Sequence, residues 1–197
     1  MSAGERLSSA GGRPRAARNA AEREGNVDFF DAVANRHSVR AFAPREVERS
    51  KVTRILQAAN AAPSAGNLQA YQIYLASGRA DRLALAYAAL SQMFIAEAPI
   101  VLVFCAVPAR SERKYRSRGR DLYCLQDATI AAAYAQLAAS ALGLGSVWVG
   151  AFDEGEVRRA LDIPGDERPV AIIAIGYAAE RQEHTPRREL DDLVRER

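Results

Sequence analysis

Residues 35–42 read Asn-Arg-His-Ser-Val-Arg-Ala-Phe, and this stretch places two arginines and a serine at every second position. Alternate side chains of an extended segment share one face, so we expect Arg36, Ser38 and Arg40 to project together. Guanidinium groups match phosphate oxygens with paired hydrogen bonds, and a hydroxyl adds a neutral donor. The spacing therefore predicts a small phosphate-binding clamp, although an arginine-rich segment alone is equally typical of a solvated surface.

A second polar stretch at 62–69 reads Ala-Pro-Ser-Ala-Gly-Asn-Leu-Gln. Its proline bends the chain, and its glycine allows a positive φ. Its short polar side chains are Ser64, Asn67 and Gln69. Taken alone, such a loop is more often only a turn. Because an amphipathic helix separates the two stretches, we interpret them together as parts of a site for a phosphorylated, heteroaromatic ligand.

The composition is that of an ordinary folded protein. Of the 197 residues, 49% are hydrophobic, which is enough for one domain with a sizeable core. The net charge of +3 is small, and the pI near 9.1 reflects arginine content more than a basic face, so no nucleic-acid partner is expected. No apolar stretch approaches the length of a membrane-spanning helix, so no membrane partner is expected either.

Residues 1–25 are rich in Ala, Arg, Gly and Ser and show no hydrophobic periodicity. We expect them to form a disordered tail, followed by one folded domain over 26–197. They lack the apolar stretch of a signal peptide, so we expect a cytoplasmic protein. Cys105 and Cys124 lie in apolar surroundings without metal-ligand spacing, which predicts two buried thiols and no metal site.

Hydrophobic periodicity and turn residues predict alternating helices and strands. Helices are expected over 28–35, 50–61, 81–90, 122–142 and 154–161. Strands are expected over 71–76, 100–107, 146–149 and 170–175. Ser50 is expected to cap the second helix, and the charged stretch 109–120 is expected to be a connection. The longest helix is rich in alanine, so another helix can approach it closely, and Gly143 and Gly145 are expected to end it.

These motifs, taken in order, resemble the FMN-dependent nitroreductase family. The resemblance rests on Arg36-His37-Ser38-Val39-Arg40, Ala62 to Gln69, Gln126-Asp127, Gly143-Leu144-Gly145, Trp148-Val149-Gly150-Ala151-Phe152 and Ile175-Gly176-Tyr177. It extends from about Asp28 to about Val194. It implies an α+β fold with a central, mostly antiparallel sheet flanked by helices, and an intertwined homodimer with two FMN sites at the subunit interface. It also implies an NAD(P)H oxidoreductase that reduces nitroaromatics, quinones or similar acceptors by a ping-pong mechanism, in which the flavin carries the chemistry.

The resemblance further implies which residues bind FMN. Arg36 and Ser38 would hold the phosphate and ribityl end, and Arg40 would lie near the N1–C2 edge of the ring. Pro63, Ser64 and Asn67 would reach the flavin from the partner subunit, with Ala65 in the same loop and Gln69 in support of it. The other implied residues are His37 of the first motif, Val149, Gly150 and Ala151 near N5 and O4, Gln92 near the pyrimidine ring, and Arg187, with Arg188 as the alternative, at the phosphate.

This chain departs from the family in the segment before its second strand. Larger members carry an asparagine and a lysine there, whereas the aligned residues here are Ser91-Gln92-Met93-Phe94. Gln92 is expected to take the place of the amide, but the lysine is missing, which leaves the ring electrostatics and the substrate open. The stretch 110–120 is a candidate lid beside the flavin, or equally a solvated loop.

Other functions remain open on the same fold. They are a peptide azoline dehydrogenase, a flavin-consuming synthesis of a cobamide base, and a flavin-binding module without turnover. A nucleic-acid-associated protein that uses its basic tail is a further alternative. The choice between NADH and NADPH, and the physiological electron acceptor, also remain open.

Overall fold

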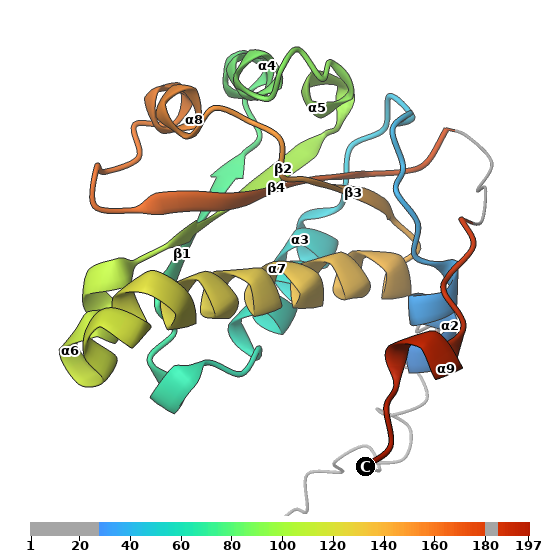
Figure 1. Cartoon of the computed structure of the whole chain (residues 1–197). Coiled ribbons are helices and arrows are strands. Elements are labelled where there is room, and N and C mark those ends of the chain that lie inside the picture. The colour runs from blue at the N-terminus through green and yellow to red at the C-terminus, as the bar shows by residue number, and fades with distance from the viewer. Residues whose placement is uncertain (1–27, 180–184) are drawn as a thin grey trace, which may run out of the picture.

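The computed structural model describes residues 28–179 and 185–197, which form a central sheet between two layers of helices (Figure 1). The tail expected at 1–25 lies outside the described residues. In chain order the elements are α2 (Phe29–Asn35), α3 (Arg49–Asn60), the 3₁₀ turn η1 (Ala65–Asn67), β1 (Tyr71–Ala76), α4 (Arg79–Ala88), α5 (Phe94–Glu97), β2 (Ile100–Ala106), α6 (Pro108–Arg118), the π turn η2 (Gly119–Tyr123), α7 (Cys124–Ala141), β3 (Gly145–Val149), α8 (Glu154–Ala160), β4 (Arg168–Gly176) and α9 (Leu190–Leu193).

The sheet has the strand order β1-β2-β4-β3, and each neighbouring pair is antiparallel. Tyr71 of β1 pairs with Ala106 of β2, and Ile100 of β2 pairs with Ile175 of β4. The α3 and α7 helices lie on one face, and α4, α5 and α8 lie on the other (Figure 1). The predicted α+β architecture with an antiparallel central sheet is therefore confirmed.

The two central strands are apolar on both faces because helices cover both sides of the sheet. In β2, Leu102 and Phe104 belong to the core formed with α3 and α7, whereas Val101 and Val103 belong to the core formed with α4, α5 and α8. All four side chains are fully buried. Burying each one stabilises the fold by about 1.5–3 kcal/mol relative to leaving it exposed. The continuous apolar run thus forms the buried strand that was predicted.

A Schellman motif ends the long helix α7. The N–H of Leu144 donates to the Ala139 carbonyl at 2.9 Å, and the N–H of Gly143 donates to the Ser140 carbonyl at 3.0 Å. Gly143 has a φ of 72°, a left-handed conformation that glycine adopts without strain. The prediction that glycine ends this helix is confirmed for Gly143, whereas Gly145 begins the next strand.

The N-cap of α3 is Glu48, so the prediction of Ser50 was wrong. The Glu48 carbonyl accepts from the N–H groups of Lys51 and Val52 at 2.9 and 3.2 Å. The Glu48 carboxylate does not cap the helix, because it accepts a hydrogen bond from the Tyr177 hydroxyl at 2.7 Å. A tertiary contact with the end of the sheet therefore outweighs the local preference for a serine cap.

The stretch after β2 is a helix, not the connection that was predicted. It begins at Pro108, which suits a first helical turn because it has no N–H to leave unpaired. Gly119 packs so closely on this helix that a Cβ there would lie 2.5 Å from the Ser111 carbonyl oxygen. The rings of Tyr115 and Tyr123 meet edge to face with centroids 5.1 Å apart. The helix α6 therefore folds back onto the start of α7 and depends on these contacts more than on apolar periodicity.

The remaining expectations concern short elements, cysteines and membrane spans. The short helix α5, which lies in the connection between α4 and β2, was not expected. Cys105 and Cys124 are both buried free thiols, as predicted. Among the described helices, none combines the length and the apolar character that crossing a bilayer requires.

Candidate functional site

The first motif leaves α2 as an extended segment beside β3. The N–H of Val39 donates to the Ser146 carbonyl at 3.0 Å, and Ser38 forms a parallel bridge with Ser146. Val39 is fully buried against Gly145, where a Cβ would lie 2.7 Å from Val39 Cγ2. Ser38 and Arg40 are exposed. Ser38 and Arg40 therefore lie on the face opposite the buried valine, as predicted, whereas Arg36 is the C-cap of α2 and is half-buried.

Arg36 lies half-buried at the end of α2, near the guanidinium of Arg187. Burial, together with the positive charge of Arg187, lowers the pKa of Arg36. Neither guanidinium forms an ion pair with a carboxylate in the part of the chain that the structure describes. Arg188, by contrast, donates from Nη2 to the Asp192 carbonyl at 2.8 Å. Arg36 and Arg187 are therefore suited to bind a shared anion.

His37 adds an unpaired nitrogen beside this pair. Its Nδ1 donates to the Asn35 carbonyl at 3.1 Å, which places the proton on Nδ1. Its Nε2 is buried and has no hydrogen-bond partner among the described residues. Arg36 and His37 both line a cavity of about 250 Å³ between α2 and the end of α7. The cavity is too small for a whole nucleotide, but Arg36 and His37 make it a polar position.

The second motif is a loop that Asp127 of α7 holds in place. One carboxylate oxygen accepts from the N–H of Ala65 at 2.9 Å, and the other accepts from the N–H of Ala70 at 3.3 Å. Asp127 is only 1% exposed, so backbone donors replace water as the partners of its charge. Within the loop, Ser64 Oγ accepts from the N–H of Gln69 at 3.0 Å. The Ser64 hydroxyl hydrogen therefore remains available to donate to a ligand.

Three residues of this loop have left-handed backbone angles. The φ angles are 58° at Gly66, 56° at Asn67 and 48° at Gln69. At the two residues that are not glycine, such angles cost about 1–3 kcal/mol each. A Cβ at Gly66 would lie 2.5 Å from Tyr115 Oη and 2.7 Å from Lys114 Nζ, so the loop lies directly against α6. Contacts with both α6 and α7 therefore impose the shape of the loop.

The third segment follows β3. Val149 is buried, whereas Gly150 and Ala151 are exposed. A Cβ at Gly150 would lie 3.5 Å from Trp148 Nε1, which is an ordinary contact. No described neighbour within this chain therefore requires glycine at this position. Its missing side chain leaves the backbone open to close approach by a flat ligand.

Gln92 joins this third segment to the turn after α4. Its Nε2 donates to the Ala89 carbonyl at 2.8 Å and to the Ala151 carbonyl at 3.2 Å. Leu90 and Ser91 precede it with φ angles of 58° and 60°, so the turn is strained. Both amide hydrogens of Gln92 are used within the chain. Gln92 therefore positions the Ala151 segment and has only its carbonyl oxygen left for a ligand.

The two motifs lie at opposite ends of α7. Near the start of the helix, Asp127 holds the loop of the second motif. Near its end, Ser140 Oγ donates to the Ala32 carbonyl of α2 at 2.8 Å, shortly before Arg36. The helix between these two contacts spans about 20 Å at 1.5 Å per residue. Figure 1 shows α2 and α6 at opposite ends of α7. One copy of the chain therefore cannot bring both motifs to the same part of a small ligand.

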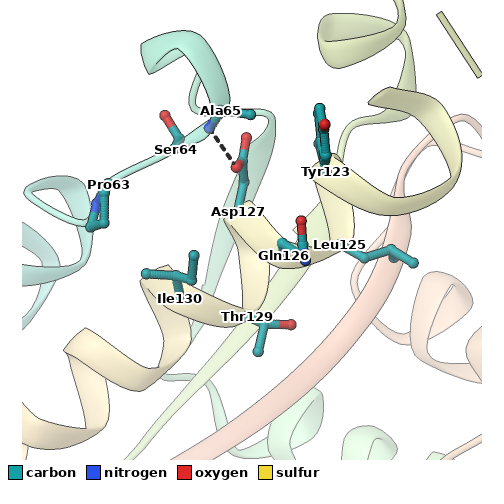
Figure 2. Close-up of a pocket in the computed structure, with 9 residues that line it drawn as sticks. All are labelled: Pro63, Ser64, Ala65, Tyr123, Leu125, Gln126, Asp127, Thr129 and Ile130. Atoms are coloured by element: carbon teal, nitrogen blue, oxygen red, sulfur yellow. Dashed lines mark hydrogen bonds between the residues drawn. The ribbon is translucent and has the colours of Figure 1, made fainter. Parts of the chain in front are cut away.

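A cavity of about 550 Å³ opens between the second motif and the first turns of α7. Figure 2 shows the loop and the helix as its two walls, joined by the hydrogen bond between Ala65 and Asp127. It is lined by Pro63, Ser64, Ala65, Tyr123, Leu125, Gln126, Asp127, Thr129 and Ile130. Its volume is typical of sites for small organic molecules. Over residues 28–179 and 185–197, no three His, Cys, Asp or Glu side chains gather into a possible metal site.

Comparison with known proteins identifies this arrangement. The model of the nitroreductase family matches residues 33–95 and 79–177, which together cover most of the chain. The chain belongs to the nitroreductase family. The matched residues include the first motif, the loop at 62–69, α7 and the segment after β3, whereas Arg187 lies beyond them.

Relatives of this nitroreductase family member align over most of their own length. An NADH dehydrogenase of Thermus thermophilus is 30% identical over 195 residues, which cover 85% of this chain and 95% of the relative. A 5,6-dimethylbenzimidazole synthase of Rhodospirillum rubrum is 30% identical over 194 residues, which cover 84% of this chain and 88% of the relative. The solved structure of the NADPH:FMN oxidoreductase from Vibrio harveyi complexed with NAD+ is 25% identical, with a TM-score of 0.78, covering 85% of this chain and 76% of the other.

The structure of this nitroreductase family member brings some of the predicted residues together. Arg36 lies near Arg187, and Gln92 meets Ala151. The residues from Pro63 to Gln69 lie apart from both groups, at the far end of α7. Their separation within one copy agrees with the prediction that they serve the partner subunit, which remains a prediction.

Asp127 was not predicted to support the loop, and Tyr123 was not predicted to belong to the site. Asp127 appeared only as part of a motif, although it is the one charged residue between Cys124 and Ala141. A single carboxylate in an otherwise apolar helix is a signal, because burying it requires dedicated donors. Tyr123 gave no comparable signal, since its place in the cavity wall depends on how α6 folds back.

Proposed function

We propose that this member of the nitroreductase family, an FMN-dependent NAD(P)H oxidoreductase, reduces nitroaromatics, quinones or similar acceptors by two electrons in a ping-pong cycle. The family match and the likeness to the Vibrio harveyi NADPH:FMN oxidoreductase support the dependence on FMN and NAD(P)H. The observation that carries the proposal is the cavity lined by Arg36 and His37, together with the unpartnered Nε2 of His37 and the positive charge of Arg187 that acts on Arg36. Two neighbouring guanidinium groups without a described carboxylate partner are expected where a phosphate binds.

The groups around this pair fit the phosphate and ribityl end of FMN. Arg36 and Arg187 supply two guanidinium groups. Each charge-assisted hydrogen bond from them to the phosphate would contribute roughly 1.5–3 kcal/mol to binding. Ser38, two residues after Arg36, has an exposed hydroxyl. His37 has a buried ring nitrogen without a hydrogen-bond partner among the described residues. A bound phosphate would also offset burial and the charge of Arg187, the two effects that lower the pKa of Arg36.

When bound, FMN accepts a hydride from NAD(P)H and passes two electrons to the acceptor. The chain supplies orientation and electrostatics for this chemistry. Arg40 is exposed on the same face as Ser38, and it would provide a positive charge beside the ring of a bound flavin. Gly150 presents open backbone, and Gln92 fixes the adjacent Ala151. No side chain is needed as a nucleophile, and water provides the proton that the acceptor takes up.

We further propose a homodimer in which each FMN site takes the first motif from one copy and the loop at 63–69 from the other. The separation of these motifs along α7 supports this arrangement, because one copy cannot close the site. A two-fold axis near the middle of α7 would exchange the ends of the two helices and bring the motifs together.

The surface of α7 and its neighbours also supports dimerisation. The alanine-rich helix is apolar around most of its circumference, yet Tyr134 is 40% exposed and Ile130 is only partly buried. Large apolar side chains of α2 and α9 are also exposed. They are Phe29 at 62%, Phe30 at 76%, Leu190 at 72% and Leu193 at 55%. Exposed apolar surface on this scale is typical of a protein–protein interface, and a second copy would cover it.

A cytoplasmic location is part of the proposal. Cys105 and Cys124 are both unpaired thiols, which suits a reducing compartment. NAD(P)H as a soluble reductant suits the same compartment.

The test is anaerobic spectroscopy of the purified full-length protein. It should be yellow, and its flavin band should bleach on addition of NADH or NADPH and return when a quinone or nitroaromatic is added. Sedimentation analysis should give the mass of a dimer. A colourless protein that takes up no added FMN would overturn the proposal, and a flavin that neither nucleotide reduces would favour a binding module without turnover.

A second candidate function is flavin-consuming synthesis of a cobamide base. The 30% identity to the 5,6-dimethylbenzimidazole synthase of Rhodospirillum rubrum favours it. The two functions differ in the fate of the flavin. An oxidoreductase returns its FMN unchanged after many turnovers with an acceptor, whereas a synthase consumes reduced FMN in air and releases a benzimidazole, which chromatography would detect.

A further inference from the structure

The α6–η2 segment is strongly basic and lies at the larger cavity. It carries Arg110, Arg113, Lys114, Arg116, Arg118 and Arg120 against only Glu112 and Asp121. Arg120 forms ion pairs with both acidic residues, at 3.1 Å from Glu112 and 2.8 Å from Asp121. Both acidic side chains of the segment therefore pair with Arg120, and neither forms an ion pair with the other cations of the segment.

Three of these cations, Arg110, Lys114 and Arg118, follow one another at intervals of four residues, and we call them the α6 stripe. Each contacts an element of the site through a neutral group. Arg110 Nη1 donates to the Gln69 carbonyl at 2.9 Å, and Arg118 Nε donates to the Tyr123 hydroxyl at 2.9 Å. Lys114 Nζ would lie 2.7 Å from a Cβ on Gly66. The stripe therefore borders both the loop and the cavity wall.

Ion pairing does not explain the stripe. Arg110 and Lys114 lie four residues apart on the helix before its kink at Arg116, where like charges repel each other and destabilise the helix. The stripe residues are exposed, and none of them pairs with a carboxylate among the described residues. Arg116, in the same helix, has a φ of 52° and a ψ of −138°, so the backbone that presents these charges is strained. Strain and unpaired charge at one place are typical of a binding surface.

The packing of the segment fixes where the stripe lies. Gly119 lies against the Ser111 carbonyl, and Tyr115 packs edge to face on Tyr123. Arg118 also lies over the Tyr123 ring, 5.3 Å from its centroid. Tyr123 lines the cavity, so the guanidinium of Arg118 lies against one of the cavity's lining residues. Its charge would therefore attract an anionic ligand that enters the cavity.

We propose that the α6 stripe binds the phosphate groups of the reduced nicotinamide nucleotide and makes the enzyme prefer NADPH to NADH. This inference rests on the proposed function, because it concerns the hydride donor of that same site. NADPH differs from NADH by a 2′-phosphate, which adds between one and two negative charges near neutral pH. A row of unpaired cations beside the site discriminates in favour of the more anionic donor and does so less at high salt.

The experiment compares Lys114→Gln and Arg118→Gln with Arg113→Gln, which removes one charge from the same helix but outside the stripe. The wild type should have a higher kcat/KM for NADPH than for NADH, and added salt should reduce the difference. Each stripe variant should lower kcat/KM for NADPH by about tenfold and that for NADH by about threefold or less. Arg113→Gln should change the ratio by less than about twofold.

A binding measurement without redox chemistry accompanies the kinetics. Calorimetry should show that the FMN-loaded wild type binds adenosine 2′,5′-bisphosphate more tightly than 5′-AMP, and each stripe variant should lose this difference. A wild type that prefers NADH, or stripe variants whose NADPH/NADH ratio equals that of Arg113→Gln, would overturn the inference. The proposed function would survive that result, since it fails only if FMN does not bind or neither nucleotide reduces it.

Discussion

The carboxylate of Asp127 accepts a 2.9 Å hydrogen bond from the backbone N–H of Ala65, which lies 62 residues earlier in the sequence. A second bond from Ala70 completes the attachment, so the loop between them is fixed to the start of α7. The loop contains strained residues at Asn67 and Gln69 that would relax without this support. Asp127 is therefore the support on which the far half of the proposed site depends.

Replacing this carboxylate should loosen the loop. Asp127→Asn has one amide nitrogen that cannot accept, so one buried N–H loses its partner, and we expect a loss of about 1–3 kcal/mol in the free energy of unfolding. FMN affinity should fall as well, because the loop would no longer keep its shape. Urea unfolding and flavin titration measure the two effects. The control is Asp81→Asn on the opposite face of the sheet, where the carboxylate is exposed. Equal behaviour of the two variants would contradict the role of Asp127.

The pair at the phosphate can be tested by removing each guanidinium. Arg36→Ala and Arg187→Ala should each weaken FMN binding by about ten- to a hundredfold, because each loses a charge-assisted contact. Arg188→Ala is the matched control, since its guanidinium is engaged by the Asp192 carbonyl. Fluorescence titration of the apoprotein with FMN measures all three. A larger loss in Arg188→Ala than in Arg187→Ala would exchange the roles of these neighbours.

Gly66 should not tolerate a side chain. Gly66→Ala places a Cβ 2.5 Å from Tyr115 Oη at a φ of 58°, so the backbone is strained and the ends of the Tyr115 and Lys114 side chains must move. We expect a loss of about 1–2 kcal/mol in unfolding free energy and weaker FMN binding. Gly165→Ala is the control, because a Cβ there would meet no atom within 4 Å. A thermal melt in which both variants match the wild type would show that the loop is free to shift.

The contact between Glu48 and Tyr177 predicts a pH dependence. The Tyr177 hydroxyl bond is the main reason that the pKa of Glu48 is lowered to about 2, with a smaller effect from Lys51. A lowered carboxylate pKa stabilises the fold above the unfolded value near 4.5, and this contribution is lost as the pH falls towards 2. Tyr177→Phe should therefore lower Tm at pH 6, and the difference from the wild type should shrink between pH 4.5 and 2. A difference independent of pH would show that only packing was lost.

Much of the fold follows from local patterns. The apolar run of β2 and the glycine at 143 predicted a buried strand and a helix end, because periodicity and φ preference act within a few residues. The prediction of Ser50 as a cap was wrong because Glu48 gains a partner in Tyr177, which is remote in sequence. The stretch that forms α6 was misread for the same reason, since its helix depends on Gly119 and Tyr123.

The sequence by itself determined which residue types could bind a flavin phosphate and that Ser38 and Arg40 share a face, because alternation along an extended segment is a local property. Only the tertiary structure decided that Arg36 lies near Arg187 and that the loop held by Asp127 lies at the other end of α7. Contacts between distant segments depend on how helices and strands pack, and packing is a property of the whole core. The resemblance already implied a second copy, and the structure adds a physical reason for it, because the two motifs lie at opposite ends of α7 within one chain.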